Sequence, residues 1–359
     1  MPPSPGTGKE GKARSRSRFA IVAVLLAFTS IVVFGAAPAA AQPVADFYRG
    51  KQLRMIIGIE PGTAYDLYAR LVTRHMGKYI PGNPTIIPQN MPGAGSLNAY
   101  NYIYNVAPKD GTAFGTGHRF VPLMPLLGLP GAQFDGAKFT YIGSANREVD
   151  ICMIRTDSGV TTLDQWKQRE VMVGTTGGGA ELTTFYGTIA SMLGMKMKVV
   201  TGYRSQNDLY LAIDRGEIQG RCGGSYLNLM SAHGHWMEQK LVNIVMQIGL
   251  SKDPALPQVP LITDLVTNAR DRAALQLMLS PNEMGRPFVA PPDVPADRAQ
   301  ALRDAFDKAT HDRELIEEGK RQLLDIDPIT GQRMAELVAS AYAAPADVVE
   351  RARALVAGK

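Results

Sequence analysis

Two stretches decide the fold: RMIIGIEPGTAYDLYARLVTRHMG at residues 54–77 and TIIPQNMPGAGSLNAYNYIYNVAPKDG at residues 85–111. Each begins with an apolar run typical of a strand, passes through a loop rich in glycine and proline, and ends in a pattern typical of a helix. A helix that begins directly after such a loop presents unpaired backbone N–H groups, which attract anions. Neither copy contains a catalytic residue, so the pair predicts a site that binds an anion without transforming it.

The alternation of strand and helix continues along the chain. Residues 149–222 repeat it, with a third glycine-bearing loop at residues 177–179, and after residue 248 the pattern becomes mainly helical. Alternating elements with short connections predict an α/β fold with parallel-type sheets. Ligand sites in such folds lie beyond the carboxyl ends of the strands, so we expect the three loops to face one another across a cleft between two lobes.

The first 41 residues have the three parts of a secretory signal peptide. A basic segment precedes an uncharged apolar run over residues 19–36, and Ala39-Ala40-Ala41 supplies a small-residue cleavage site. We expect the leader to be cleaved after export by the general secretory route. The alternative is that the apolar run is retained as a membrane anchor.

Removing this leader changes the charge of the protein. The leader carries +4 of the formal +5 of the whole chain, which leaves +1 for residues 42–359. The basic character of the sequence therefore belongs to the leader and does not indicate a nucleic-acid partner. The charged residues of the leader are Lys9, Glu10, Lys12, Arg14, Arg16 and Arg18.

Two cysteines, Cys152 and Cys222, lie on expected strands of the same region. In an exported protein such a pair either forms a disulfide or remains as two buried thiols that behave as small apolar residues. The sequence does not give their separation, so both alternatives stay open.

The sequence lacks the common signatures of enzymes and of metal sites. It contains no P-loop, no G-x-S-x-G elbow, no C-x-x-C and no H-E-x-x-H motif. His233 and His235 are spaced as metal ligands can be, but without a nearby carboxylate or cysteine we interpret them as part of a polar surface loop. His118 ends an expected strand on the cleft side, where it either contacts a ligand or has a structural role. We therefore predict a protein that is not an enzyme and that needs no metal or cofactor.

The loops themselves offer few ligand-binding side chains. Thr63 or Asp66 either caps the helix after the first loop or contacts a ligand. The second loop offers no side chain beyond the hydroxyl of Ser96, so any binding there uses backbone N–H groups. Three arginines, Arg119, Arg147 and Arg221, are candidates for direct pairing with a carboxylate, and salt bridges within the protein are the alternative for each.

Several segments together resemble one known family. They are PGTAYDLYARLVTRHMGKYIPGNPTIIPQNMPGAGS, APKDGT, GTTGGGAE, GYRSQNDLYLAIDRGEI and PFVAPPDVPADRAQALRDAF, which occur in this order over essentially all of the mature chain. They resemble the substrate-binding proteins of tripartite tricarboxylate transporters, also called Bug or TctC-like periplasmic receptors.

The resemblance implies a type II periplasmic-binding-protein fold of two lobes. It places lobe one at residues 42–147 and 247–359 and lobe two at residues 148–246. It also implies a ligand held largely by backbone N–H groups of the loops. The expected ligand-binding residues are Gly62, Thr63, Ala64, Tyr65, Asp66, Gly93, Ala94, Gly95, Ser96, His118 and Arg119 in lobe one, and Thr175, Gly177, Gly178, Gly179, Ala180, Tyr203, Ser205 and Arg221 in lobe two.

The chain departs from the family pattern at three places. Thr63 and Ala64 follow Gly62, where the family commonly has Pro-Gly-Gly-x-x-Asp. Arg204 and Ser205 replace the usual lysine and glycine after Tyr203. Gln219 stands where many members have an aspartate suited to an ammonium group, and this disfavours an amino-acid ligand.

These features predict a monomeric periplasmic receptor that captures a small organic anion and delivers it to the permease subunits of a tripartite transporter. One alternative is a receptor that senses the anion and signals to a partner protein. A less favoured alternative is an enzyme acting on a carboxylate substrate, for which only Asp66, His118 and Cys222 are available as reactive groups.

Overall fold

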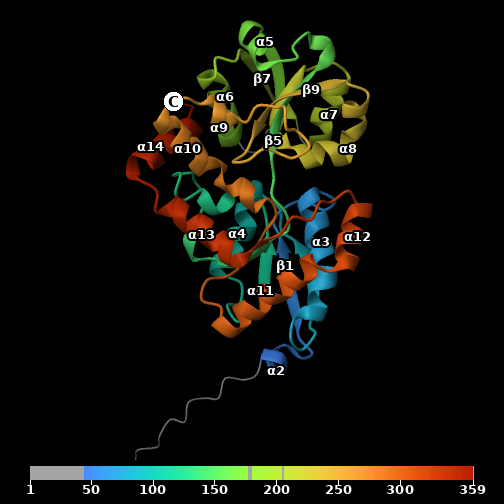
Figure 1. The fold of residues 1–359 in the computed structure, drawn as a ribbon. Coiled ribbons are helices and arrows are strands. Elements are labelled where there is room, and N and C mark those ends of the chain that lie inside the picture. The colour runs from blue at the N-terminus through green and yellow to red at the C-terminus, as the bar shows by residue number, and fades with distance from the viewer. Residues whose placement is uncertain (1–43, 177–179, 204–205, 359) are drawn as a thin grey trace, which may run out of the picture. The chain divides into compact units, whose positions relative to one another are not determined.

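The computed structural model describes residues 44–176, 180–203 and 206–358. The expected leader at residues 1–41 lies outside this range. Among the described residues the strands form two sheets (Figure 1). Sheet A has the order β11 (Ile329–Thr330), β4 (Thr140–Ser144), β10 (Pro287–Ala290), β3 (Ala113–Thr116), β1 (Gln52–Ile57) and β2 (Thr85–Asn90), and sheet B has the order β7 (Met197–Tyr203), β6 (Val171–Thr176), β8 (Gly220–Ser225), β5 (Asp150–Arg155) and β9 (Val242–Ile248).

Helices cover both faces of sheet A, because its strands alternate buried side chains between two cores. On β1, Leu53, Met55 and Ile57 join one apolar cluster, and Ile56 joins another. Figure 1 shows α3 beside β1, and α11 contacts α3 and β4. The helices of this part are α2 (Val44–Tyr48), α3 (Ala64–Met76), α4 (Leu97–Asn105), α11 (Ala296–Thr310), α12 (Arg313–Arg321) and α13 (Gly331–Tyr342).

Sheet B has the same division of its side chains. On β5, Ile151 and Met153 belong to the cluster around α7 and α8, whereas Cys152 and Ile154 belong to the cluster that continues toward sheet A. The helices that accompany this sheet are α5 (Leu163–Gln168), α6 (Ala180–Met192), α7 (Gln206–Asp214), α8 (Tyr226–Glu238) and α9 (Ile262–Leu265). Two further helices, α10 (Ala269–Leu279) and α14 (Ala346–Val356), contact each other, and α14 also contacts α6. None of the helices in the described part of the chain is both long enough and apolar enough to cross a membrane.

The α/β fold class predicted from the sequence is confirmed, but the sheets are not purely parallel. In sheet A, β1 pairs in parallel with β2 and β3, while β10 and β11 run antiparallel to their neighbours. In sheet B, β5 runs antiparallel to both β8 and β9. Of these strands, β5 and β10 are the first to enter a sheet after the chain has crossed from the other sheet, whereas β11 follows β10 in the same sheet. The lobe boundaries at residues 147/148 and 246/247 stay a prediction.

The interpretation of His233 and His235 as a surface loop is wrong, because both lie in α8. The Ser225 side chain accepts a hydrogen bond from the Asn228 N–H and caps this helix, and Leu229 and Trp236 pack it against sheet B. The helix is kinked at His233, where φ is −140°. The segment carries apolar residues that this packing buries, so it forms a helix and not a loop.

The chain passes between the two sheets twice. It leaves sheet A between β4 and β5 and returns between β9 and β10. The two connections are bonded to each other: the Gly285 N–H donates to the Asn146 carbonyl over 3.0 Å, and the Glu148 N–H donates to the Asn282 carbonyl over 2.8 Å. This paired backbone brings residues 145–150 beside residues 282–286.

Candidate functional site

The carboxyl ends of three parallel strands lie at one edge of sheet A. Ile57 at the end of β1 is in register with Asn90 of β2 and Thr116 of β3. The two predicted glycine loops follow β1 and β2 at this edge, and His118 and Arg119 follow β3 there. Strand register therefore brings together these parts of the chain, although Gly62 and Arg119 are 57 residues apart in sequence.

The first loop is organised by the carboxylate of Asp66. Its Oδ2 accepts from the Gly62 N–H over 2.9 Å, and its two oxygens also accept from the side chains of Arg70 and Asn90. Thr63 is the N-cap residue of α3, but its hydroxyl donates to the Glu60 carbonyl and does not cap the helix. The Asp66 carboxylate thus has its hydrogen-bond partners within the chain, and anion binding by the backbone N–H groups of the first turn of α3 stays a prediction.

Hydrogen bonding also sets the ionisation of Asp66. Burial alone would raise its pKa, but bonds from Arg70, the Gly62 N–H and Asn90 outweigh that effect and hold the pKa below its ordinary value. The carboxylate therefore stays charged at neutral pH. Its ion pair with Arg70 offsets the negative charge that it would otherwise present to an anion beside the loop.

The second loop has an unusual backbone. Four consecutive residues have positive φ angles: Gly93 (128°), Ala94 (47°), Gly95 (59°) and Ser96 (82°). For Ala94 and Ser96 this left-handed conformation costs roughly 1 kcal/mol or more each. The structure holds it partly through Ser96, which is buried and whose Oγ accepts from the His118 N–H over 2.9 Å. The Ser96 hydroxyl is therefore engaged with the neighbouring strand end.

The predicted residues of sheet B are only partly described. Gly177, Gly178, Gly179 and Ser205 lie outside the described residues. Thr175 is half-buried near the end of β6, and Ala180 is the first residue of α6. Tyr203 ends β7 opposite Thr176 of β6, so these positions follow a common edge of sheet B.

His118 has a neutral imidazole in this environment. Burial and the positive charge of Arg119 lower its pKa to about 3. Its ring lies 6.0 Å, centroid to centroid, from that of Tyr65. A neutral ring of this kind can accept or donate a hydrogen bond but adds no charge to the site.

Arg119 lies at the centre of a buried polar network. Its Nε donates to Asn282 Oδ1 over 3.0 Å, and its Nη2 lies 2.6 Å from Asp150 Oδ2. The same Asp150 oxygen accepts from the Tyr186 hydroxyl over 3.0 Å, and the Arg119 N–H donates to the Tyr65 hydroxyl over 3.1 Å. Burial would raise the Asp150 pKa, but the charge of Arg119 and these hydrogen bonds hold it below its ordinary value. Arg119 therefore already has a carboxylate partner within the chain.

The other two candidate arginines also have partners. Arg221 is buried, and its Nε and Nη2 donate to the Gly223 carbonyl over 3.0 and 2.7 Å. Gly223 has φ of +82°, and a Cβ there would lie 2.3 Å from the Tyr186 ring. Arg147 pairs with Asp327 in a half-exposed salt bridge. Direct pairing of any of the three with a ligand stays a prediction.

A second buried ion pair lies where the two connections between the sheets meet. Arg286 Nη2 is 2.7 Å from Glu148 Oε1, and both side chains are almost fully buried. The Arg286 guanidinium also lies over the Tyr65 and Tyr68 rings, at 4.3 and 5.2 Å from their centroids. The ion pair thus links α3, which follows the first glycine loop, to the two connections between the sheets.

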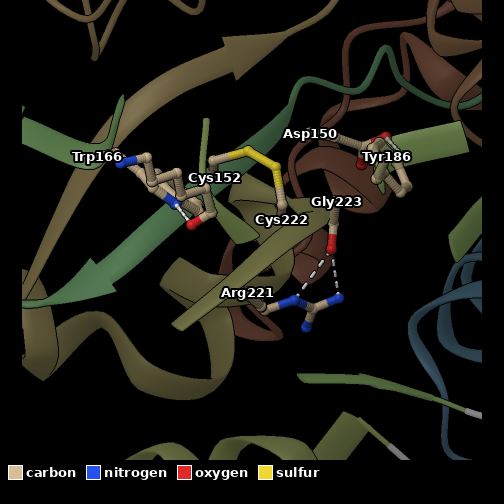
Figure 2. The surroundings of a disulfide bond; sticks show 8 residues. Asp150, Cys152, Trp166, Tyr186, Arg221, Cys222 and Gly223 are labelled. Atoms are coloured by element: carbon tan, nitrogen blue, oxygen red, sulfur yellow. Dashed lines mark hydrogen bonds between the residues drawn. A yellow bond between two sulfur atoms is a disulfide. The ribbon is translucent and has the colours of Figure 1, made fainter. Parts of the chain in front are cut away.

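Cys152 and Cys222 form a disulfide between the antiparallel strands β5 and β8. The sequence left open a disulfide or two buried thiols, and the structure contains the disulfide. Figure 2 shows the disulfide near Trp166, with Arg221 turned toward Gly223 on the strand that carries Cys222. The bridge therefore fastens the strand that begins with Asp150 to the strand that carries Arg221.

One cluster of potential metal ligands occurs among the described residues, at the opposite end of α3. Ligand atoms of His75, Asp312 and Glu314 lie within 4.8 Å of one another. The Lys78 ammonium already lies 2.6 Å from Asp312 Oδ2 and 2.9 Å from Glu314 Oε2. A cation of the chain itself thus takes the place that a metal ion would need.

Sequence reasoning missed Glu148, Asp150, Asn282 and Arg286. Three of them stand at or near the start of an apolar run: Glu148 and Asp150 at that of residues 151–154, and Arg286 at that of residues 287–290. In the structure these three residues are buried where the two connections between the sheets are hydrogen-bonded to each other. Single-sequence patterns do not show that pairing.

Comparison with known proteins identifies the fold. No protein-family model matches the chain, and no curated protein matches its sequence. Solved structures are similar: a TctC solute-binding protein from Polaromonas has a TM-score of 0.63 at 17% identity, with 82% of this chain and 96% of that chain covered.

Two further structures are similar to the same degree. MatC from Rhodopseudomonas palustris, solved with bound malate, has a TM-score of 0.61 at 17% identity, with 84% of this chain and 99% of that chain covered. Another R. palustris protein, solved with adipate, has a TM-score of 0.61 at 15% identity, with 84% and 97% covered. The chain therefore has the α/β fold of TctC and Bug-type periplasmic solute-binding proteins, to which it is similar over most of its length.

Proposed function

We propose that this chain is a periplasmic solute-binding protein that captures a small organic anion with at least one carboxylate. The observation that carries the proposal is the common edge of β1, β2 and β3, where two glycine loops follow neighbouring strands and lead into α3 and α4 on opposite faces of the sheet. Helix N-termini at such an edge bind anions through backbone N–H groups. The fold shared with proteins solved with malate and adipate supports the same ligand class.

The carboxylates near this edge should not repel a bound anion, because their negative charges are compensated within the chain. The carboxylates of Asp66, Asp150 and Glu148 are each paired with an arginine. A binding role without catalysis is supported by three features: His118, with a pKa of about 3, is a weak base, the carboxylates are paired with arginines, and Cys222 is in a disulfide. We further propose that the loaded protein delivers its ligand to a membrane permease of the tripartite tricarboxylate type, as the resemblance in sequence motifs implies.

A thermal-shift screen tests the ligand class. We expect the protein from residue 42 onward to be stabilised by one or more di- or tricarboxylates, with malate and adipate as the first probes. A ligand at a hundredfold excess over its Kd adds about 2.7 kcal/mol of stability. The matched control for each acid is its neutral amide, which should leave the melting temperature unchanged. Stabilisation by neutral sugars or metal ions, with none by any organic acid, would contradict the proposal.

A further inference from the structure

Arg119 connects parts of the chain that the proposed ligand site requires to act together. Its backbone N–H donates to the hydroxyl of Tyr65, which lies in the first turn of α3 beside the first loop. The residue before it, His118, donates its backbone N–H to Ser96 in the second loop. Both loops of sheet A are therefore bonded to the two-residue segment that follows β3.

The side chain of Arg119 extends this network to sheet B. Its ion partner Asp150 is the first residue of β5, and the same carboxylate oxygen accepts from Tyr186 in α6. Its other partner, Asn282, lies in the connection that returns to sheet A and donates its amide to the Ile248 carbonyl at the end of β9. One guanidinium thus joins the loops of sheet A to a strand, a helix and the returning connection of sheet B.

The partners are buried and their charges are matched. The Arg119 and Asp150 side chains have 10% and 3% of their surface exposed. The charge of Asp150 holds the Arg119 pKa above its ordinary value, and the charge of Arg119 lowers that of Asp150. Asp150 already supplies the counter-charge of Arg119, and removal of Arg119 would leave the Asp150 carboxylate buried without a counter-ion, which costs several kcal/mol.

From this geometry we propose that Arg119 is a positioning residue, which acts on ligand affinity through Asp150 and is not the counter-ion of the ligand. The inference rests on the proposed function. The Arg119–Asp150 pair holds the loops of sheet A in a fixed relation to β5 and α6, so the ligand meets donors from both sheets already in place. Loss of either partner removes this preorganisation.

A double-mutant cycle separates this role from direct ligand contact. The variants are Arg119→Met, Asp150→Leu and the double variant, with binding of malate and adipate measured by calorimetry well below each melting temperature. We expect each single change to weaken binding at least tenfold, and the double variant to bind no more weakly than the worse single variant. Direct contact predicts the opposite sign for Asp150→Leu, because removing a competing carboxylate would free Arg119 and strengthen binding. That result would overturn the proposal.

Arg333→Met is the matched control. It also removes an arginine from an ion pair, but Arg333 and its partner Glu336 are both exposed on α13. We expect its affinity for either acid to stay within about twofold of the wild type. A loss as large as that of Arg119→Met would show that general positive charge, and not the pair, sets the affinity.

Urea unfolding of the same variants tests the pair without any ligand. We expect Arg119→Met to lower the unfolding midpoint, and the added Asp150→Leu change to restore part of the loss, because the buried carboxylate is then removed as well. Additive losses in the double variant would overturn the proposal. If the acids bind to no variant but the midpoints show this coupling, the proposed function fails while the pair stands.

Discussion

Replacing Arg286 by methionine should lower the free energy of unfolding by about 3–5 kcal/mol, because the change leaves a buried carboxylate without its partner. Arg286 and Glu148 have 2% and 0% of their side-chain surface exposed and lie 2.7 Å apart. The guanidinium also donates to the Gly285 carbonyl and covers the Tyr65 ring. Urea denaturation followed by circular dichroism would measure the loss.

Two control variants identify the cause. Arg313→Met removes an arginine from an ion pair with Glu317 that is largely exposed, so its loss should be no more than about 0.5 kcal/mol. The double change Arg286→Met with Glu148→Leu should recover much of the stability, since it removes both charges together. A loss below about 1 kcal/mol in Arg286→Met, or no recovery in the double variant, would contradict a buried ion pair at the connections.

Reducing the disulfide should destabilise the protein by about 4 kcal/mol, the chain-entropy value for a loop of this size. Cys152 and Cys222 are 70 residues apart in sequence, and the loop between them contains most of sheet B. The bridge restricts the unfolded chain far more than the folded one, in which β5 and β8 are already paired. The measurement is the urea midpoint with and without a phosphine reductant.

The double variant Cys152→Ala with Cys222→Ala is the control for this experiment. Its stability should not respond to the reductant, whereas that of the wild type should fall. Thiol titration of the denatured, unreduced protein should detect no free thiol. Two reactive thiols in that titration would show that the cysteines are unpaired in the protein as isolated.

Most elements of the fold could be predicted from apolar periodicity alone. The two stretches at residues 54–77 and 85–111 contain most of β1 and all of α3, β2 and α4, in the predicted order of strand, loop and helix. The strand β10 (Pro287–Ala290) and the helix α14 (Ala346–Val356) were missed. The first is a four-residue strand inside a segment dense in proline, and the second is a short amphipathic helix whose buried face becomes apparent only against α10.

The candidate site was predictable in its backbone and less so in its charges. Glycine spacing identified the loops because positive φ angles, such as those of Gly62, Gly93 and Gly95, favour that residue. The partners of Arg119 were not predictable, since Asp150 and Asn282 reach it only through strand register and the return of the chain from the other sheet. Long-range pairing of this kind leaves no periodic trace in one sequence.

The central claim is that backbone N–H groups at the start of α3 bind the anion. Its most direct test is calorimetric titration of an Ala64→Pro variant with the acid that stabilises the protein most in the screen. Ala64 is the first residue of α3, where proline fits the helix and removes only an N–H donor. The preceding residue, Thr63, is already extended, as proline requires. Ala269→Pro makes the same change at the first residue of α10, away from the loops.

The account predicts that Ala64→Pro keeps its melting temperature and binds the acid at least about tenfold more weakly, the value of one hydrogen bond to a charged group. Ala269→Pro should bind as the wild type does. Equal affinity of Ala64→Pro, Ala269→Pro and the wild type would contradict an anion held by the N–H groups at the start of α3.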